Sequence, residues 1–191
     1  MLLPANGGVS IERAGGSSNL AAVASLCVDA FVDLPTGPAS LTMAELVEQW
    51  EQQLAGRLER PQHALLIARR EEAETPIGCV ELGLLPPPPT RPGADVPYMA
   101  NVAVLPQARR EGIGRLLVSA GEALAMSWGY EDLYCRVDRP NFDARRLYDR
   151  AGFRPIFLQQ SKPDWRNKQK ATIFLVKELG GDQVEEEVAH S

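Results

Sequence analysis

The order of apolar and polar residues along the chain predicts several β-strands, because apolar residues alternate with polar ones or form short runs bounded by turns. The predicted strands are residues 9–13, 63–69, 77–85, 98–105 and 132–137. The second and third form a hairpin around a charged turn. The fourth is mostly apolar on both faces, and it lies between Pro97 and Pro106 because proline cannot donate to a strand ladder.

Apolar residues that recur every three or four positions predict α-helices. The predicted helices are residues 20–31, 42–58, 113 to about 128, and the stretch between Asn141 and Gly152. Ser18 can cap the first helix, Thr42 opens the second, and Asn141 can cap the last. Gly129 and Gly152 suit helix ends, since glycine readily adopts the left-handed conformation found there.

A basic turn with two glycines, Arg109-Arg110-Glu111-Gly112-Ile113-Gly114, joins the strand at 98–105 to the next helix. The first N–H groups of a helix have no partner inside the helix, so they can bind a phosphate. A Cβ at either glycine would hold a diphosphate away from these amides, and Arg115 adds further positive charge. The turn therefore predicts an anion site, with a plain strand-to-helix connection as the alternative.

Two common phosphate-binding motifs do not fit this turn. A Walker loop requires lysine where the chain has Arg115, and a dinucleotide fingerprint requires glycine where it has Leu117. The pattern [Q/R]xxGx[G/A], formed by Arg109, Gly112 and Gly114, resembles the GNAT superfamily of acetyl-CoA-dependent N-acetyltransferases. In that family the turn holds the diphosphate of coenzyme A.

A second motif supports the resemblance. Residues 141–153 follow the GNAT pattern N-x-x-A-x-x-L-Y-x-x-x-G-F, with Tyr148 in the middle of an apolar helical stripe. A buried phenol needs a polar partner, so Tyr148 is either a core residue bonded to a backbone carbonyl or a functional group. The resemblance favours function and implies that Tyr148 is the general acid that protonates the sulfur of coenzyme A.

The resemblance runs from about residue 9 to residue 179 and implies an α/β (α+β) fold, the GNAT fold. This is a mixed, mainly antiparallel sheet of about seven strands with helices on both faces, and residues 155–159 and 172–177 supply its closing strands. The central strands, 98–105 and 132–137, are expected to splay apart and leave a cleft for acetyl-CoA. Residues 1–8 are expected to be a flexible N-terminus and residues 180–191 an acidic flexible tail.

The resemblance also implies how acetyl-CoA, the co-substrate, is held. Its pantetheine arm would pair with the backbone at 102–104, and its diphosphate would lie on the amides of residues 110–115. The residues expected to bind the cofactor are Val102, Ala103, Val104, Arg109, Arg110, Glu111, Gly112, Ile113, Gly114, Arg115, Asn141, Phe142, Asp143 and Tyr148.

The general base is less clearly defined by the sequence. Tyr98 stands where some N-terminal acetyltransferases of the superfamily place a tyrosine, and it is predicted as a second catalytic residue. The strand position that carries histidine in those enzymes is Arg136 here, and Glu81, acting through a water, is another candidate base. His63, at the start of a predicted strand, is expected to be structural.

Composition limits the function further. The chain has 191 residues, 45% of them hydrophobic, and a net charge of −5, which argues against a nucleic acid as its partner. Its odd number of cysteines, Cys27, Cys79 and Cys135, indicates buried thiols in a reducing compartment, and two histidines leave little for a metal site. We therefore expect an intracellular soluble protein with no metal and no membrane partner, while its oligomeric state stays open.

The sequence thus favours an N-acetyltransferase that acts on a peptide or protein amine. Deprotonating an α-amine of pKa about 8 at pH 7 costs roughly 1.4 kcal/mol, against roughly 4.6 for a lysine of pKa about 10.4, so weak base machinery favours protein N-termini, with lysine second. A small-molecule amine acetyltransferase and a non-catalytic acyl-CoA-binding module are the alternatives. Trp128-Gly129, the segment 133–141 and Trp165 resemble the plastid branch of plant and algal acetyltransferases, which implies the chloroplast stroma, with the cytoplasm as the alternative.

Overall fold

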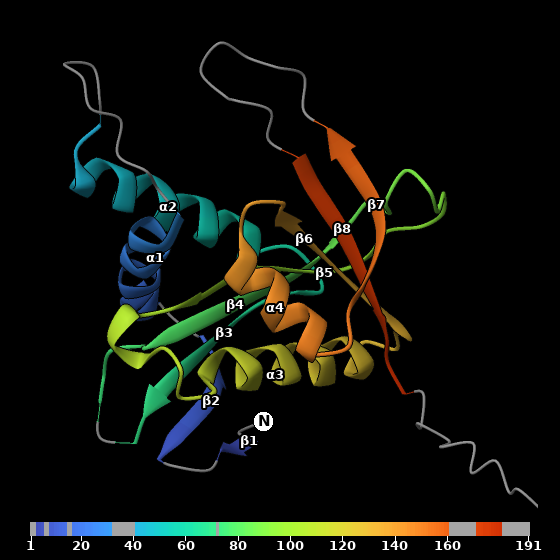
Figure 1. Ribbon diagram of the computed structural model, residues 1–191. Helices are drawn as coiled ribbons and strands as arrows, with labels where there is room; N and C mark the ends of the chain where they lie inside the picture. The colour runs from blue at the N-terminus through green and yellow to red at the C-terminus, as the bar shows by residue number, and fades with distance from the viewer. Residues whose placement is uncertain are drawn as a thin grey trace, which may run out of the picture.

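A computed structural model describes residues 3–5, 8–14, 17–31, 41–71, 73–160 and 171–180 (Figure 1). Most of these residues belong to one sheet and the helices on its two faces. The strands are β1 (Leu3–Ala5), β2 (Val9–Arg13), β3 (His63–Arg70), β4 (Gly78–Leu85), β5 (Val96–Val104), β6 (Asp132–Asp138), β7 (Arg154–Gln160) and β8 (Ala171–Glu178). The helices are α1 (Ser17–Phe31), α2 (Met43–Leu58), α3 (Ile113–Ser127) and α4 (Phe142–Arg150), with a 3₁₀ turn, η1 (Pro106–Ala108).

The strands form an eight-stranded sheet in the order β1-β2-β3-β4-β5-β6-β8-β7, in which β5 and β6 are the one parallel pair. These two strands pair only at Tyr98 with Tyr134 and at Met99 with Cys135. Beyond this point β6 remains paired with β8, as far as Asp138. The predicted mixed, mainly antiparallel sheet and its splayed centre are therefore confirmed.

The N-terminal strand β1 was not predicted. Residues 1–8 were expected to be flexible, but Leu3–Ala5 pairs antiparallel with β2 and adds an eighth strand to the predicted seven. Three residues are too short to show an alternating pattern, and an edge strand tolerates Pro4 because only one side of it is paired. For a similar reason β5 includes Pro97, which pairs with Leu84 of β4 before the contact with β6 begins.

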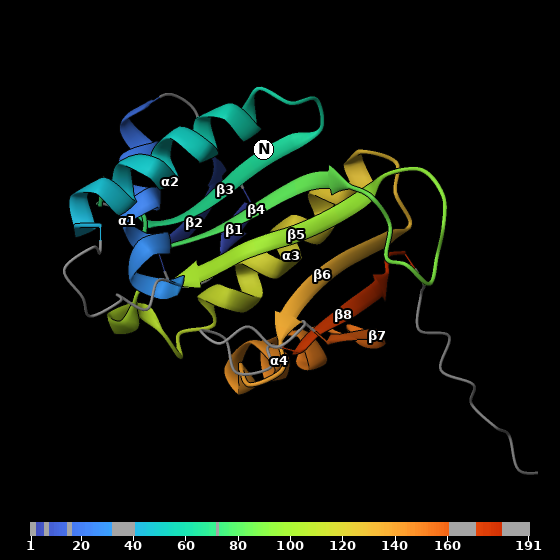
Figure 2. The same ribbon diagram turned by 90° about the horizontal axis from the view of Figure 1, so that it is seen from above.

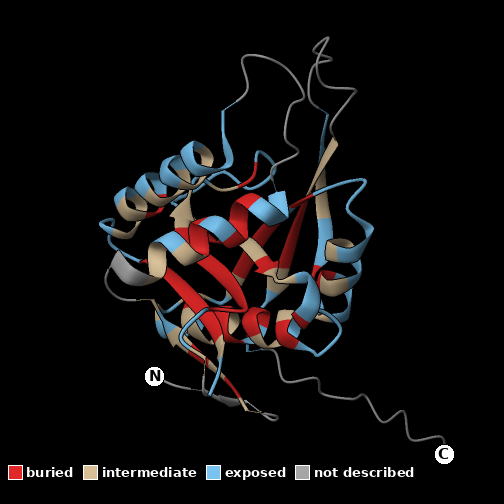
Figure 3. Cartoon of the chain, turned by 90° about the vertical axis from the view of Figure 1, so that its left-hand side faces the viewer, coloured by how far each residue is buried: buried red, intermediate tan, exposed pale blue. Residues whose placement is uncertain are grey.

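Helices cover both faces of the sheet. Figure 2 shows α1 and α2 on one face, where α1 contacts β4 and β5 and α2 contacts β3, and α3 across the other face. One apolar core lies beneath α1 and α2, around Leu65 and Ile67. A larger core, which includes Leu117 and Tyr148, lies beneath α3 and α4. Buried residues follow the strands and the inward faces of the helices (Figure 3).

The ends of the helices follow the predicted capping signals. Thr42 and Glu45 form a reciprocal capping box at α2, and the Asn141 side chain accepts a hydrogen bond from the Ala144 amide at 3.1 Å. Gly129 and Gly152 both have a φ of +87° just after α3 and α4. The cap of the first helix was predicted wrongly, because α1 already begins at Ser17.

The three cysteines are free and buried, as the sequence predicts. Within the described ranges, no group of three or more histidine, cysteine, aspartate or glutamate side chains is arranged to hold a metal ion. None of the helices described is both long and apolar enough to span a bilayer.

Candidate active site

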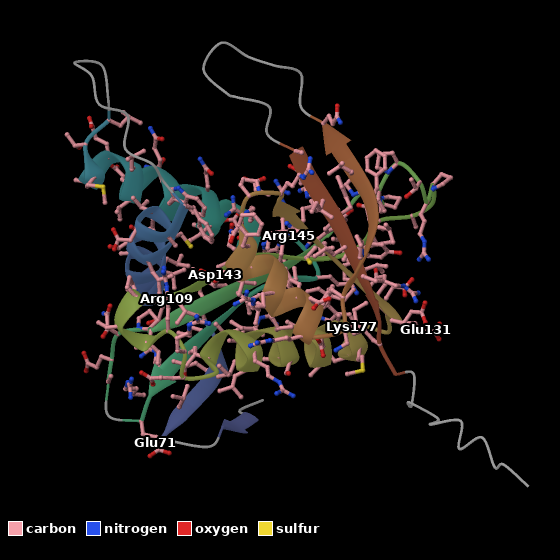
Figure 4. All side chains as sticks on the ribbon, viewed as in Figure 1. Glu71, Arg109, Glu131, Asp143, Arg145 and Lys177 are labelled. Atoms are coloured by element: carbon pink, nitrogen blue, oxygen red, sulfur yellow. The ribbon has the colours of Figure 1, made fainter. Side chains whose placement is uncertain are left out.

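A cavity of about 610 Å³ lies where β5 ends and separates from β6. The end of β5, the turn before α3, one face of α4 and the last residues of α1 line it. Arg109 from the turn and Asp143 from α4 are labelled in Figure 4. The structure thus gathers in one place every residue predicted to bind the cofactor except Glu111 and Phe142.

The edge of β5 that faces the cavity is available for pairing. On its other side β5 pairs with β4, but the register shifts by one residue between the Cys79–Ala103 pair and the next pair. This bulge places Asn101 in the left-handed region, with a φ of +50°. Because β6 does not accompany β5 beyond Met99, the backbone of residues 102–104 presents an open strand edge to the cavity, suited to an extended ligand.

The turn before α3 exposes amide groups at the start of the helix. Gly112, at the N-cap, has a φ of +84° and a conformation that other residues rarely adopt. It offers no capping side chain, and the first helical bond runs from the Leu116 amide to the Gly112 carbonyl. The amides of residues 113–115 therefore precede the hydrogen-bonded part of α3, which makes this helix end a site for an anion.

The two glycines of the turn differ in their surroundings. A Cβ on Gly112 would have no protein atom within 4 Å, so this glycine supplies conformation and open space. A Cβ on Gly114 would lie 3.4 Å from Cδ2 of Leu147, an ordinary van der Waals contact, and Gly114 lines the cavity as well. That both glycines keep space for a ligand therefore stays a prediction.

The lining of the cavity carries a strong positive charge. Arg109, Arg110 and Arg115 come from the turn and the start of α3, and Arg146 and Arg150 come from α4. Arg146 and Arg150 were not predicted from the sequence. Their spacing could have predicted them, because residues 143, 146, 147 and 150 share one face of a helix and Asp143 was already a predicted cofactor residue. A ligand with several phosphate groups fits this lining.

Tyr148 reaches the cavity from the inner side of α4. Its side chain is only 5% exposed, and its ring packs edge-on against Phe153, with the ring centres 5.5 Å apart. Burial raises the pKa of Tyr148 well above its ordinary value of 10.0, and the nearby Cys135 adds to this effect. The phenol therefore keeps its proton at neutral pH, and no other described side chain makes a hydrogen bond to it.

Two predicted cofactor residues point elsewhere. Glu111 forms an ion pair with Arg70 of β3, with oxygen–nitrogen distances of 2.9 and 3.0 Å. Phe142 is 70% exposed and lies under the Arg145 guanidinium, 5.5 Å from its carbon. The prediction for Phe142 came from its motif position, which does not report the direction of a side chain. The prediction for Glu111 concerns its backbone amide, which this ion pair does not involve, so it stays a prediction.

Tyr98 is not part of this cavity. Met99 and Cys135 pack in the core beneath α3, so their neighbours Tyr98 and Tyr134 point to the opposite face of the sheet, where their rings lie 5.7 Å apart. Burial raises the pKa of Tyr98 from 10.0, which disfavours the deprotonated form that a base requires. The structure therefore does not support Tyr98 as the general base.

Glu81 is held by a buried network. Its Oε1 accepts hydrogen bonds from Arg57 Nε and His63 Nε2, both at 2.6 Å, and its Oε2 accepts one from Asn101 Nδ2 at 2.5 Å. Burial alone would raise the pKa of Glu81, but the bonds from His63 and Arg57 outweigh it and lower the pKa to about 2. Glu81 is thus a poor base, and His63 is structural, as predicted.

The fold and the cavity agree with the comparison to known families. A model of the acetyltransferase (GNAT) family matches residues 23–153, which include the turn before α3 and the whole motif at 141–153. The chain belongs to this family. GNAT enzymes transfer an acetyl group from acetyl-CoA to an amine, and the open strand edge, the exposed amides and the five arginines fit that co-substrate.

The individual relatives are more distant. GCN5-related N-acetyltransferase 4, chloroplastic, of Arabidopsis thaliana is 41% identical over 65 residues, which cover 34% of this chain and 22% of that protein. The match thus spans less than a quarter of the relative's length.

Two solved structures share the fold, each with a TM-score of 0.64 and 15% identity. The protein yncA of Salmonella typhimurium, solved with its cofactor acetyl-CoA, aligns over 93% of this chain and 97% of its own. The ribosomal-protein-S18-alanine N-acetyltransferase of Escherichia coli aligns over 95% and 99%.

Proposed function

We propose that this GNAT family member transfers acetyl from acetyl-CoA to the α-amine at the N-terminus of proteins, with the lysine ε-amine as a slower second acceptor. One observation carries the proposal. The cavity contains a protonated phenol, Tyr148, while the two side chains considered as bases, Tyr98 and Glu81, are both unsuited to accept a proton. Such a site suits an amine that is already neutral in a useful fraction of its molecules.

Acetyl-CoA supplies the reactive thioester, and the residues of the cavity hold it. The backbone of residues 102–104 binds the extended pantetheine arm in the manner of an added strand. The amides of residues 110–115 bind the diphosphate, and the arginines of the turn and of α4 neutralise its charge. Asn141 and Asp143 border the same ligand at the start of α4.

Tyr148 acts as the general acid. Its hydroxyl donates a proton to the coenzyme A sulfur as the amine nitrogen bonds to the acetyl carbon and the carbon–sulfur bond breaks. The amine nitrogen releases one proton to water, and a proton from water restores the phenol, whose raised pKa keeps it protonated across the neutral range. The backbone amides near Val102 polarise the acetyl carbonyl, because the bulge and the absence of β6 leave this edge of β5 free.

The unsuitability of Tyr98 and Glu81 as bases determines the preferred acceptor. At pH 7 deprotonation of an α-amine costs roughly 1.4 kcal/mol and deprotonation of a lysine roughly 4.6 kcal/mol. An enzyme that does not assist this deprotonation therefore reacts faster with N-termini. The same fold serves an N-acetyltransferase named for an alanine of ribosomal protein S18, which supports a peptide acceptor. The chloroplastic relative supports a plastid location, with the cytoplasm as the alternative.

Paired peptides test the proposal. One peptide carries a free N-terminus and no lysine, and its partner carries a blocked N-terminus and one internal lysine; a polyamine represents small-molecule acceptors. Mass spectrometry at pH 7.5 should show the free N-terminus reacting faster by about tenfold or more. Faster acetylation of the lysine peptide or of the polyamine would overturn the choice of acceptor, and no transfer to any amine would indicate a non-catalytic acyl-CoA-binding module.

A further inference from the structure

A cation stands between two aromatic rings on the face of the sheet opposite Tyr148. The Arg136 guanidinium carbon, from β6, lies 5.4 Å from the ring centre of Tyr98 and 5.8 Å from that of Phe174. Tyr98 and Phe174 are buried, whereas Arg136 is exposed. The two rings hold the guanidinium in place while leaving its N–H groups open to a ligand.

Arg136 lies next in the chain to a residue that packs near Tyr148, the proposed proton donor. Its neighbour Cys135 packs in the same core as Tyr148 and influences the pKa of that phenol. Successive residues of a strand point to opposite faces, so Arg136 lies across β6 from the proton donor, just beyond the last paired residues of β5 and β6. The separation of β5 from β6 thus begins next to Arg136.

Three acidic side chains on this face have other partners. Glu81 is bonded to Arg57, His63 and Asn101, as described above. Asp132 accepts hydrogen bonds from Arg91 and from the Tyr134 hydroxyl. Asp138, the next residue on the same side of β6, accepts a hydrogen bond from Thr172 Oγ1 at 3.3 Å. Among the residues that the structure describes, none forms an ion pair with Arg136.

We propose that Arg136 binds a carboxylate of the acceptor, so that the preferred substrates are N-termini with Asp or Glu in the first two positions. This inference rests on the proposed function and names its substrate class. A guanidinium presents paired N–H donors that match a carboxylate, and its fixed position between two rings lowers the entropy lost on binding. The same positive charge disfavours acceptors with lysine or arginine next to the amine.

Three peptides that differ only in the second residue, Glu, Gln or Lys, test this inference. With the parent protein, kcat/KM should fall in the order Glu, Gln, Lys, with about tenfold or more between Glu and Gln, mainly through KM. The Arg136→Gln variant should remove the difference between Glu and Gln, and Arg136→Lys should keep part of it. The Arg136→Glu variant should favour the Lys peptide.

Arg60→Gln is the matched control. Arg60 is an exposed residue in the turn between α2 and β3, and its replacement changes the net charge by the same amount. It should leave the order of the three peptides unchanged, and acetyl-CoA binding by calorimetry should match in all variants. Equal kcat/KM for the Glu and Gln peptides in the parent protein, or an unchanged ratio in Arg136→Gln, would overturn the inference. The parent measurement decides even where a variant does not fold. Transfer to none of the peptides would instead contradict the proposed function.

Discussion

Oε1 of Glu81 and Nε2 of His63 lie 2.6 Å apart inside the sheet, at the centre of a network that also includes Arg57 and Asn101. The network joins four elements, because its members come from α2, β3, β4 and β5. Asn101 is the bulged residue of β5, next to the backbone that lines the cavity. The buried carboxylate therefore stabilises the bulge that shapes the candidate active site.

Replacing Glu81 by Gln should destabilise the protein by roughly 3 kcal/mol at pH 7, because the pKa of this group falls from 4.5 to about 2 on folding. A depressed pKa stabilises the fold above pH 4.5, and that contribution is lost as the pH falls toward 2. Urea unfolding of the two proteins should thus show a difference that shrinks below pH 4.5. Glu74→Gln, at an exposed position, is the control, and a difference that stays constant down to pH 2 would contradict the role of the charge.

Replacing Tyr148 by Phe should lower kcat by about 100-fold or more, because general acid catalysis contributes on that scale. The dissociation constant of acetyl-CoA should change little, since the ring and its packing against Phe153 are kept. Steady-state kinetics and calorimetry measure the two effects separately. Tyr130→Phe, outside the cavity lining, should leave both unchanged. Equal turnover in Tyr148→Phe and the parent would remove this phenol from the mechanism.

Gly112 and Gly129 form a matched pair for testing the turn. Both have a positive φ, +84° and +87°, and a Cβ on either would meet no protein atom within 4 Å. Substitution by alanine at either position should therefore lower the free energy of unfolding by about 1–2 kcal/mol through backbone strain. Only Gly112→Ala should also weaken acetyl-CoA binding, by about tenfold or more, since its methyl group enters the proposed diphosphate site. Equal affinities in the two variants would argue against a ligand at this turn.

The pH dependence of the reaction should report the acceptor rather than an enzyme base. With an α-amine peptide, kcat/KM should rise about tenfold per pH unit up to about pH 8 and then level off. With a lysine peptide, it should keep rising beyond pH 9. The raised pKa of Tyr148 predicts no decline over this range. A profile that levels off near pH 6 for both peptides would show that a side chain of the enzyme accepts the proton.

The sequence predicted the parts of the fold that depend on local patterns. The capping signals at Thr42 and Asn141 and the apolar spacing of α3 and α4 gave the helices nearly to the residue. The strand β1 was missed, because pairing with β2 rather than its own three residues creates it. The left-handed Asn101 was missed for a similar reason, since its bulge is a property of the register between β4 and β5.

At the candidate site, too, the features set by local sequence were predicted and those set by tertiary contacts were not. Backbone-based predictions, such as the turn at 109–115 and the strand edge at 102–104, fall on the cavity. The predictions that depend on side-chain direction failed for Phe142, which lies under Arg145 of its own helix, and for Tyr98, which packs against Tyr134. The Glu111 side chain pairs with Arg70, and the predicted contact of its backbone amide with the diphosphate stays a prediction. Trp165, on which the plastid resemblance partly rests, lies outside the described residues, as do residues 181–191 of the predicted tail.

The most direct test of the central claim is an amide NMR titration of the labelled protein with acetyl-CoA. If the cavity binds the co-substrate as proposed, the largest shift changes should occur at the amides of residues 110–115 and 102–104, with smaller changes around Tyr148. An absence of binding, or shift changes confined to other parts of the sheet, would contradict the account.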